Sequence, residues 1–118
     1  MKNKLYYLAS CSTCARINKE LNAKTHFEMQ NIKEEKITSK QLDEMAEMAG
    51  SYESLFSRRA MKYKSMGLKD QQLSEKDYRK LILEEYTFLK RPVMIIDEEI
   101  FVGNSKKNVE AAKLKLKG

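Results

Sequence analysis

The chain is poor in the residues that interrupt or cross-link a fold. Its 118 residues include one proline, four glycines and no tryptophan, which argues against collagen-like or low-complexity segments. No stretch approaches 18 uncharged apolar residues, so a membrane-spanning helix is not expected. The apolar run 5–9 is too short for the core of a secretory signal. Together these absences predict a soluble, cytoplasmic protein with a single domain over residues 1–118.

Charged residues are abundant but unevenly spread along the chain. Twenty-three basic against 17 acidic residues give a net charge of +6, and residues 104–118 carry +4 of it, with five lysines against one glutamate. Such a tail is typical of a solvated helical face, or of a positive field that attracts small oxyanions. Because bases stack on aromatic side chains, a basic tail without aromatic residues argues against direct nucleic-acid binding.

Only two cysteines are present, and Cys11 and Cys14 stand three residues apart. A disulfide between them closes almost no loop and so adds little stability. Structural zinc normally needs four ligands, and the single histidine, His26, leaves the set short. No metal and no bound cofactor are therefore expected, His26 is assigned to a turn or the surface, and thiol redox chemistry remains as the use of the cysteines.

Hydrophobic periodicity divides the chain into two kinds of sequence. A helix is predicted from about Cys14 to Leu21, and another from Ser105 to Lys117, while residues 36–88 are mostly helical. Short apolar or alternating runs predict four strands, at 5–8, 27–32, 93–96 and 100–102. The expected order is strand–helix–strand, a helical insertion, then strand–strand–helix, which is an α/β fold with the insertion packed on the same core.

Within the insertion, local signals mark where helices start and stop. The sequence Thr38–Gln41 resembles a capping box, and Gly50 is a plausible end for the helix that follows. Shorter helical pieces are expected at 52–57 and 60–66, and Ser74 is expected to begin a third long helix. One face of that third helix is expected to carry Tyr78, Leu81, Ile82 and Tyr86.

The segment Cys11-Ser12-Thr13-Cys14 follows the first predicted strand and opens a helix. The first turn of a helix presents unpaired N–H groups and the positive end of its dipole, so a thiolate there is stabilised and its pKa falls. Cys11, upstream of the helix, is the predicted nucleophile, and Cys14, inside the first turn, is predicted to resolve a mixed disulfide. The alternative is a pair of small, buried, inert thiols.

Two basic segments could complete a site. Pro92, the only proline, follows Arg91 and precedes a strand; an X–Pro bond takes the cis form readily, and the alternative is a trans proline that starts the strand. Arg58 and Arg59 lie in the basic group 58–64. An arginine near a thiolate lowers its pKa and can fork onto an oxyanion, whereas the alternative is a solvated loop face.

Taken together, these features resemble the ArsC/Spx family of thioredoxin-like proteins, and most closely its arsenate-reductase-like members. The resemblance implies a thioredoxin-like α/β fold with a mixed four-stranded sheet, a helical insertion between strands 2 and 3, and a cis bond between Arg91 and Pro92. Four segments carry it, in matching order and separation over nearly the whole chain: 6–14, 55–59 with Tyr63 and Gly67–Leu68, 88–93, and 101–104.

The resemblance also implies an activity and its residues. Cys11 matches the cysteine that attacks the oxyanion in glutathione-coupled arsenate reductases, Arg91 matches the arginine before the cis proline, and Arg59 or Arg58 falls near a second arginine. The implied function is a thiol-dependent oxidoreductase that acts on a small oxyanion or a disulfide. Its implied electron donor is glutathione, glutaredoxin or thioredoxin.

Two departures from that pattern keep other functions open. The third arginine of those reductases is expected near Gly103–Asn104, where the chain has none; Lys106 or Lys107 could substitute as a point charge, and an arginine introduced at Gly103 is expected to raise arsenate turnover. Cys14 is also not required by those reductases. Spx-type regulators use a Cys-x-x-Cys as a redox switch and bind RNA polymerase, so its α subunit is the alternative partner. A third option is a binding module without turnover.

Overall fold

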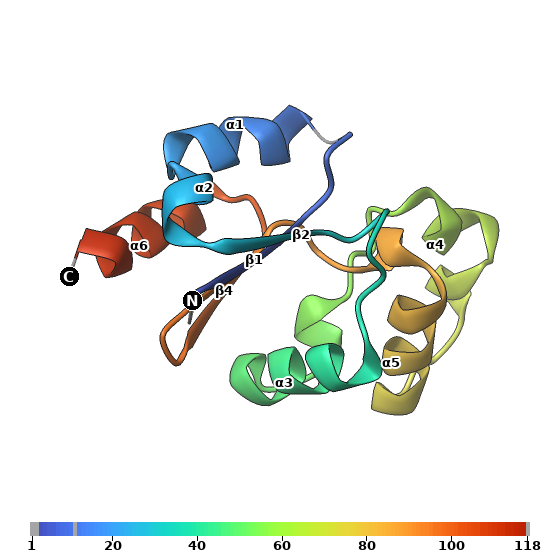
Figure 1. Ribbon diagram of the computed structural model, residues 1–118. Coiled ribbons are helices and arrows are strands. Elements are labelled where there is room, and N and C mark those ends of the chain that lie inside the picture. Colours follow the sequence, from blue (N-terminus) through green and yellow to red (C-terminus); the bar gives the residue numbers. More distant parts are fainter. Residues whose placement is uncertain (1–2, 11, 118) are drawn as a thin grey trace. The chain divides into compact units, whose positions relative to one another are not determined.

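The computed structural model describes residues 3–10 and 12–117 (Figure 1). They form two compact units: unit 1 contains the described residues up to Lys36 and from Arg91 onward, and unit 2 contains residues 37–90. Unit 2 corresponds to the helical insertion predicted at residues 36–88: it begins one residue later and ends two residues later than expected. That the whole chain forms one domain stays a prediction.

Unit 1 is built on the mixed four-stranded sheet expected from the sequence. Its strands follow the order β2-β1-β3-β4, with β1 parallel to β2 and antiparallel to β3, and β3 antiparallel to β4. The strands are β1 (Lys4–Tyr7), β2 (Glu28–Asn31), β3 (Val93–Ile96) and β4 (Glu99–Val102). This arrangement confirms the predicted α/β, thioredoxin-like class.

The hairpin between β3 and β4 is tighter than expected. Ile96 pairs with Glu99, so only Asp97 and Glu98 form the turn, and β4 begins one residue before the predicted Ile100. Asp97 has a φ of 55°, and a two-residue hairpin turn requires such a positive φ, which aspartate tolerates better than most residues.

Three helices belong to unit 1: α1 (Ser12–Glu20), α2 (Ala23–His26) and α6 (Lys106–Lys117). The first of these begins at Ser12, two residues before the predicted start at Cys14, and α2 was not predicted at all. Asn22, at a φ of 52°, redirects the chain between α1 and α2. That left-handed residue separates the buried Leu21 from the buried Ala23. A single helical period could not reveal this break. His26 is exposed at the end of α2, as expected for a surface histidine.

The core of unit 1 lies between its three helices and one face of the sheet. Strand alternation places Leu5 and its partner Met94 on the same face, together with Ile96. Figure 1 shows α1, α2 and α6 grouped beside the strands. The buried cluster consists of Leu5, Ile17, Leu21, Ala23, Phe27, Met94, Ile96, Val109 and Ala112. Tyr6, Gln30 and Val93, on the opposite face, are buried as well.

Unit 2 contains helices α3 (Ser39–Ala49), α4 (Met61–Ser65) and α5 (Glu75–Glu84), and short 3-10 turns η1 (Glu53–Leu55), η2 (Leu68–Asp70) and η3 (Tyr86–Phe88). The predicted capping box before α3 is confirmed. The Gln41 backbone N–H donates to Thr38 Oγ1 at 3.1 Å, and the Thr38 N–H donates to Gln41 Oε1 at 3.0 Å. Gly50 ends α3 at a φ of 98°, and Ser74 caps α5 in the same manner as Thr38 caps α3.

Two expectations within unit 2 were wrong. The piece predicted at 52–57 is only the short η1, because Phe56 is extended and pairs with Leu89 in an isolated antiparallel bridge. Tyr86 does not continue the face of α5, since the chain leaves that helix at Glu85 (φ −138°, ψ 111°). Glu85 forms an ion pair with Lys62 at 2.8 Å. Long-range pairing therefore overrides the local helical period here.

Aromatic packing and a polar network hold unit 2 together. The Phe56 ring stacks on Phe88 with centroids 5.0 Å apart and lies 4.9 Å from the Tyr78 ring. Arg79 on α5 binds Asp43 on α3 through Nε at 2.8 Å, and this lowers the pKa of Asp43, helped by the hydroxyl of Tyr52. Within the described residues, no helix is long and apolar enough to cross a bilayer.

The fold makes a direct prediction about stability. Leu5→Ala removes a fully buried side chain from the middle of the unit 1 sheet and should lower the free energy of unfolding by about 2–5 kcal/mol, because a cavity remains. Leu114→Ala, in the same unit at a residue that is 69% exposed, should change it by less than about 0.5 kcal/mol. Denaturant unfolding followed by circular dichroism measures both, and equal losses would contradict the assigned core.

Candidate functional site

One edge of the unit 1 sheet collects three of the segments that the sequence singled out. Val93 pairs with Tyr6 near the end of β1 and with Val102 at the end of β4. The segment that leaves β1 toward α1, the pair 91–92 before β3 and the pair 103–104 after β4 therefore meet at this edge, which we call the site edge. Antiparallel pairing makes the end of one strand the neighbour of the start of the next.

The Cys-x-x-Cys segment joins β1 to α1 at the site edge. Cys11, the predicted nucleophile, lies outside the described residues, and its neighbours Ser10 and Ser12 are exposed. Cys14 is the third residue of α1 and is fully buried, which agrees with its predicted place in the first turn. A thiol without exposed surface is closed to large reagents from solution, so only a nearby group in the protein can reach it.

The start of α1 favours a negative charge. The first turn of this helix contains no aspartate or glutamate, so no neighbouring carboxylate offsets the positive end of the helix dipole. Arg16 lies one turn further along α1 and is exposed. A thiolate at the beginning of this helix therefore meets unpaired N–H donors and a positive local field.

The bond between Arg91 and Pro92 is cis, which confirms the expectation and excludes the trans alternative. Pro92 is buried and Arg91 is half-buried. The Gly103 N–H donates to the Pro92 carbonyl oxygen at 2.9 Å, so the residues after β4 are tied to the residues before β3. Arg91 is thereby placed at the site edge in the same unit as Cys14.

Arg58 and Arg59 belong to unit 2 and differ in their bonding. Arg58 Nη2 contacts Glu53 Oε2 at 2.7 Å and donates to the Tyr78 hydroxyl at 3.1 Å; the hydrogen bond to Glu53 is the main cause of its raised pKa. Arg59 is exposed, and among the residues described it has no hydrogen-bond or ion-pair partner. Of these two candidates, Arg59 keeps its guanidinium available for a ligand.

The position expected for a third arginine has a restricted backbone. Gly103 has a φ of 96°, where any side chain is strained, so an arginine at Gly103 would carry a backbone cost and its effect on turnover stays a prediction. Asn104 is exposed, as are Lys106 and Lys107 in the first turn of α6. A cation at this end of β4 is therefore better introduced at Asn104.

One residue that the sequence reasoning missed is Asn108, which orders the loop between β4 and α6. Its side-chain Nδ2 donates to the Gly103 carbonyl oxygen at 2.8 Å, and its backbone N–H donates to Ser105 Oγ at 3.2 Å. The capping bond confirms Ser105 as the start of α6. The spacing of Ser105 and Asn108 was the available signal, because a serine cap bonds the N–H three residues later.

Comparison with known proteins agrees with this geometry. A model of the ArsC family matches residues 6–112, whereas no curated protein matches the chain.

Within the described residues, no group of three histidine, cysteine or acidic side chains could hold a metal.

Solved structures share the fold at low sequence identity. An arsenate reductase from Vibrio cholerae is 20% identical, with a TM-score of 0.75, and the match covers 94% of this chain and 97% of that one. A protein from Streptococcus mutans UA159, described as a possible arsenate reductase, is 24% identical (TM-score 0.72; 89% and 92% covered). An arsenate reductase (ArsC) related protein from Brucella melitensis is 21% identical (TM-score 0.70; 94% and 93% covered).

At these identities the solved structures establish the fold, and the family match extends over nearly all of the sequence, from within β1 into α6. It therefore includes the cysteine segment, the cis proline and the end of β4. The chain belongs to the ArsC family.

Proposed function

We propose that this protein is a thiol-dependent oxidoreductase of the arsenate-reductase type, with Cys11 as the nucleophile and Cys14 as the resolving thiol. One observation carries the proposal: Cys14 is buried in the first turn of α1, at the same sheet edge as the cis Arg91–Pro92 pair. A helix start that lowers a thiol pKa, next to a half-buried guanidinium, is suited to attack on an anionic or polarised centre.

Arg91 and Arg59 are the proposed anion-binding residues. A guanidinium fork matches two oxygens of an oxyanion or a carboxylate, and Arg91 lies beside Pro92 at the site edge. Both Arg58 and Arg59 of unit 2 are exposed, but Arg58 is paired with Glu53. Arg91 would bind an oxyanion substrate or a carboxylate of glutathione in unit 1, and Arg59 is the candidate for the same role in unit 2.

Two reactions fit these residues. With a disulfide substrate, the Cys11 thiolate attacks one sulfur and releases the other as a thiolate; the Cys14 thiol then attacks Cys11, releases the second substrate thiol and leaves a Cys11–Cys14 disulfide. With dihydrogen arsenate, two thiols and one proton yield arsenous acid, one disulfide and one water. In both cases an external thiol donor restores the reduced protein, and we propose glutathione, glutaredoxin or thioredoxin in the cytoplasm for this role.

A regulatory function is the second candidate. Asn104 stands where the third arginine of the reductases is expected, and Cys14 supplies a second thiol that those enzymes do not need. Both features suit an Spx-like protein in which the Cys11–Cys14 disulfide acts as a switch. Its partner would be the α subunit of RNA polymerase.

A paired assay separates the two functions. Purified protein is incubated with arsenate or with a mixed glutathione disulfide. The electron donor is either glutathione with glutaredoxin, or thioredoxin, and oxidation of the donor is followed over time. The Cys11→Ser variant is the control. The same preparations are tested for capture of the RNA polymerase α subunit under reducing and oxidising conditions. Turnover that depends on Cys11 supports the enzyme, whereas redox-dependent capture without turnover supports the regulator.

The thiol of Cys11 should have a lowered pKa. In the Cys14→Ser variant Cys11 is the only thiol, and its place before the start of α1 should stabilise the thiolate. The rate of iodoacetamide labelling against pH should show a midpoint well below the free-thiol value of about 8.5. A midpoint at or above that value would remove Cys11 as the nucleophile.

Cys11 and Cys14 should form a reversible disulfide. Mild peroxide should remove two hydrogens from the mass of the reduced protein, and dithiothreitol should restore them, because a sulfenic acid on Cys11 condenses with a neighbouring thiol. The Cys14→Ser variant should instead gain oxygen. Sulfinic acid on Cys11 in the unmodified protein, with Cys14 unchanged, would point to a mechanism with one cysteine.

Arsenate turnover should be weak and should improve when a cation is added at Asn104. A charge-assisted hydrogen bond contributes about 1.5–3 kcal/mol, so Asn104→Arg should raise kcat/KM for arsenate roughly tenfold to a hundredfold. Asn104→Gln is the neutral control and should leave it unchanged. If the unmodified protein already matches an efficient reductase, or if both variants behave alike, the third cation is not the limitation.

A further inference from the structure

A cavity of about 420 Å³ lies in unit 1, between α1, the start of α2 and the strands β1 and β2. Neither Cys14 nor Arg91 lines it, so it is separate from these two residues of the proposed reaction. Its volume falls within the range of pockets that bind small molecules, and at the lower end of that range.

The inner wall of the cavity is apolar. Tyr7 and Met29 line it from neighbouring strands, and both pack against the core of unit 1 while remaining only partly buried. Ala15 and Ala23 contribute small side chains from α1 and α2. Small residues opposite an aromatic ring and a thioether leave room for a flat apolar body.

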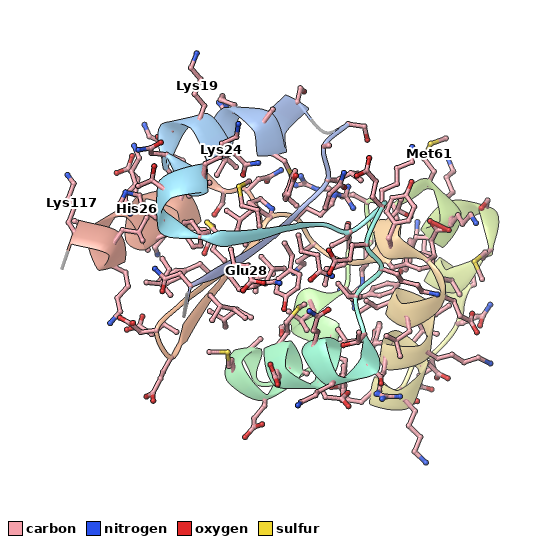
Figure 2. All side chains as sticks on the ribbon, viewed as in Figure 1. Lys19, Lys24, His26, Glu28, Met61 and Lys117 are labelled. Atoms are coloured by element: carbon pink, nitrogen blue, oxygen red, sulfur yellow. The ribbon has the colours of Figure 1, made fainter. Side chains whose placement is uncertain are left out.

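The rim is cationic and rich in donors. Lys19 and Lys24 are exposed residues that line the cavity, and none of the described residues that line it is acidic. Figure 2 shows Lys19 extending outward from α1. The carboxylates closest to them in sequence already have partners, since Glu20 pairs with Lys113 and Glu28 with Lys4.

The end of α1 and the Asn18 amide complete the polar surroundings of the cavity. The end of α1 carries about half a negative charge, which one lysine is enough to offset, so a net positive field remains at the rim. Asn18 Oδ1 is buried with no hydrogen-bond partner among the described residues. This oxygen is an acceptor, so it would pair with a donor group of a ligand and does not itself select an anion.

We infer that this cavity is a binding site for a small organic anion with a flat apolar body, such as an aromatic carboxylate of one or two rings. The rings would lie against Tyr7 and Met29, and the carboxylate would face Lys19 and Lys24. Because the cavity uses no residue of the proposed reaction, the inference stands or falls independently of the proposed function.

Three probes of related shape test it by amide NMR of the reduced full-length chain: 1-naphthaleneacetate, its neutral amide 1-naphthaleneacetamide, and acetate. The first should give saturable shifts centred on Ala15, Asn18, Ala23 and Met29. The amide should bind roughly threefold to tenfold more weakly, since exposed ion pairs contribute modestly, and acetate should not saturate. No saturable shift with the first probe, or equal binding of the acid and its amide, would overturn the inference.

Two sets of variants separate this cavity from general attraction to a basic protein. The double variant Lys19→Gln, Lys24→Gln should weaken the binding of 1-naphthaleneacetate by the same factor that separates the affinity of the acid from that of its amide. Lys33→Gln with Lys36→Gln removes the same charge from exposed residues that do not line the cavity and should have no effect. Ala15→Leu, at an exposed position of α1, should fill the cavity and block the acid and the amide alike. Equal weakening by both lysine pairs, or unchanged binding to the Ala15 variant, would refute the site.

Discussion

The antiparallel pairing of β1 with β3 is the constraint on which the rest of unit 1 depends. In this register Tyr6 lies opposite Val93, so the chain that leaves β1 and the chain that enters β3 meet at one edge of the sheet. A shift of one residue would move every side chain of a strand to the other face and would remove Leu5 and Met94, which are fully buried, from the cluster they form with the helices of unit 1. Core packing therefore fixes the register, and the register in turn places Arg91 and Pro92 beside the cysteine segment.

The fold gives Cys14 surroundings that an unfolded chain does not have. A Cys-x-x-Cys in an unfolded chain has ordinary thiols, whereas here α1 begins at Ser12 and buries Cys14 within its first turn. Burial protects that thiol from reagents in solution, and the helix start stabilises negative charge at the residues before it. The hydrogen bond from Gly103 to the Pro92 oxygen adds a second connection across this edge, so the end of β4 and the cis proline are held as one piece.

Local sequence signals predicted the elements whose ends are decided locally. Thr38 and Ser74 begin helices because their side chains cap the first turn, and the four strands of unit 1 lie within about a residue or two of their apolar runs. The two failures in unit 2 involve distant partners. Phe56 is extended because it pairs with Leu89, and Tyr86 leaves the α5 face at a residue that binds Lys62. Periodicity counts neighbours three or four residues apart, so it could not detect either pairing.

The choice between Arg58 and Arg59 likewise depends on contacts that the sequence does not show. The basic group around Arg58 and Arg59 was visible in the sequence, but two adjacent arginines are equivalent there. In the structure Arg58 holds Glu53 and the Tyr78 hydroxyl. Recruiting it to a substrate would leave both groups without their cation, and this loss would offset the new interaction. Arg59 has no hydrogen-bond or ion-pair partner among the described residues, so its guanidinium can bind a ligand without losing another interaction. Of the two, Arg59 is therefore the one whose recruitment to an anion would break no contact seen among the described residues.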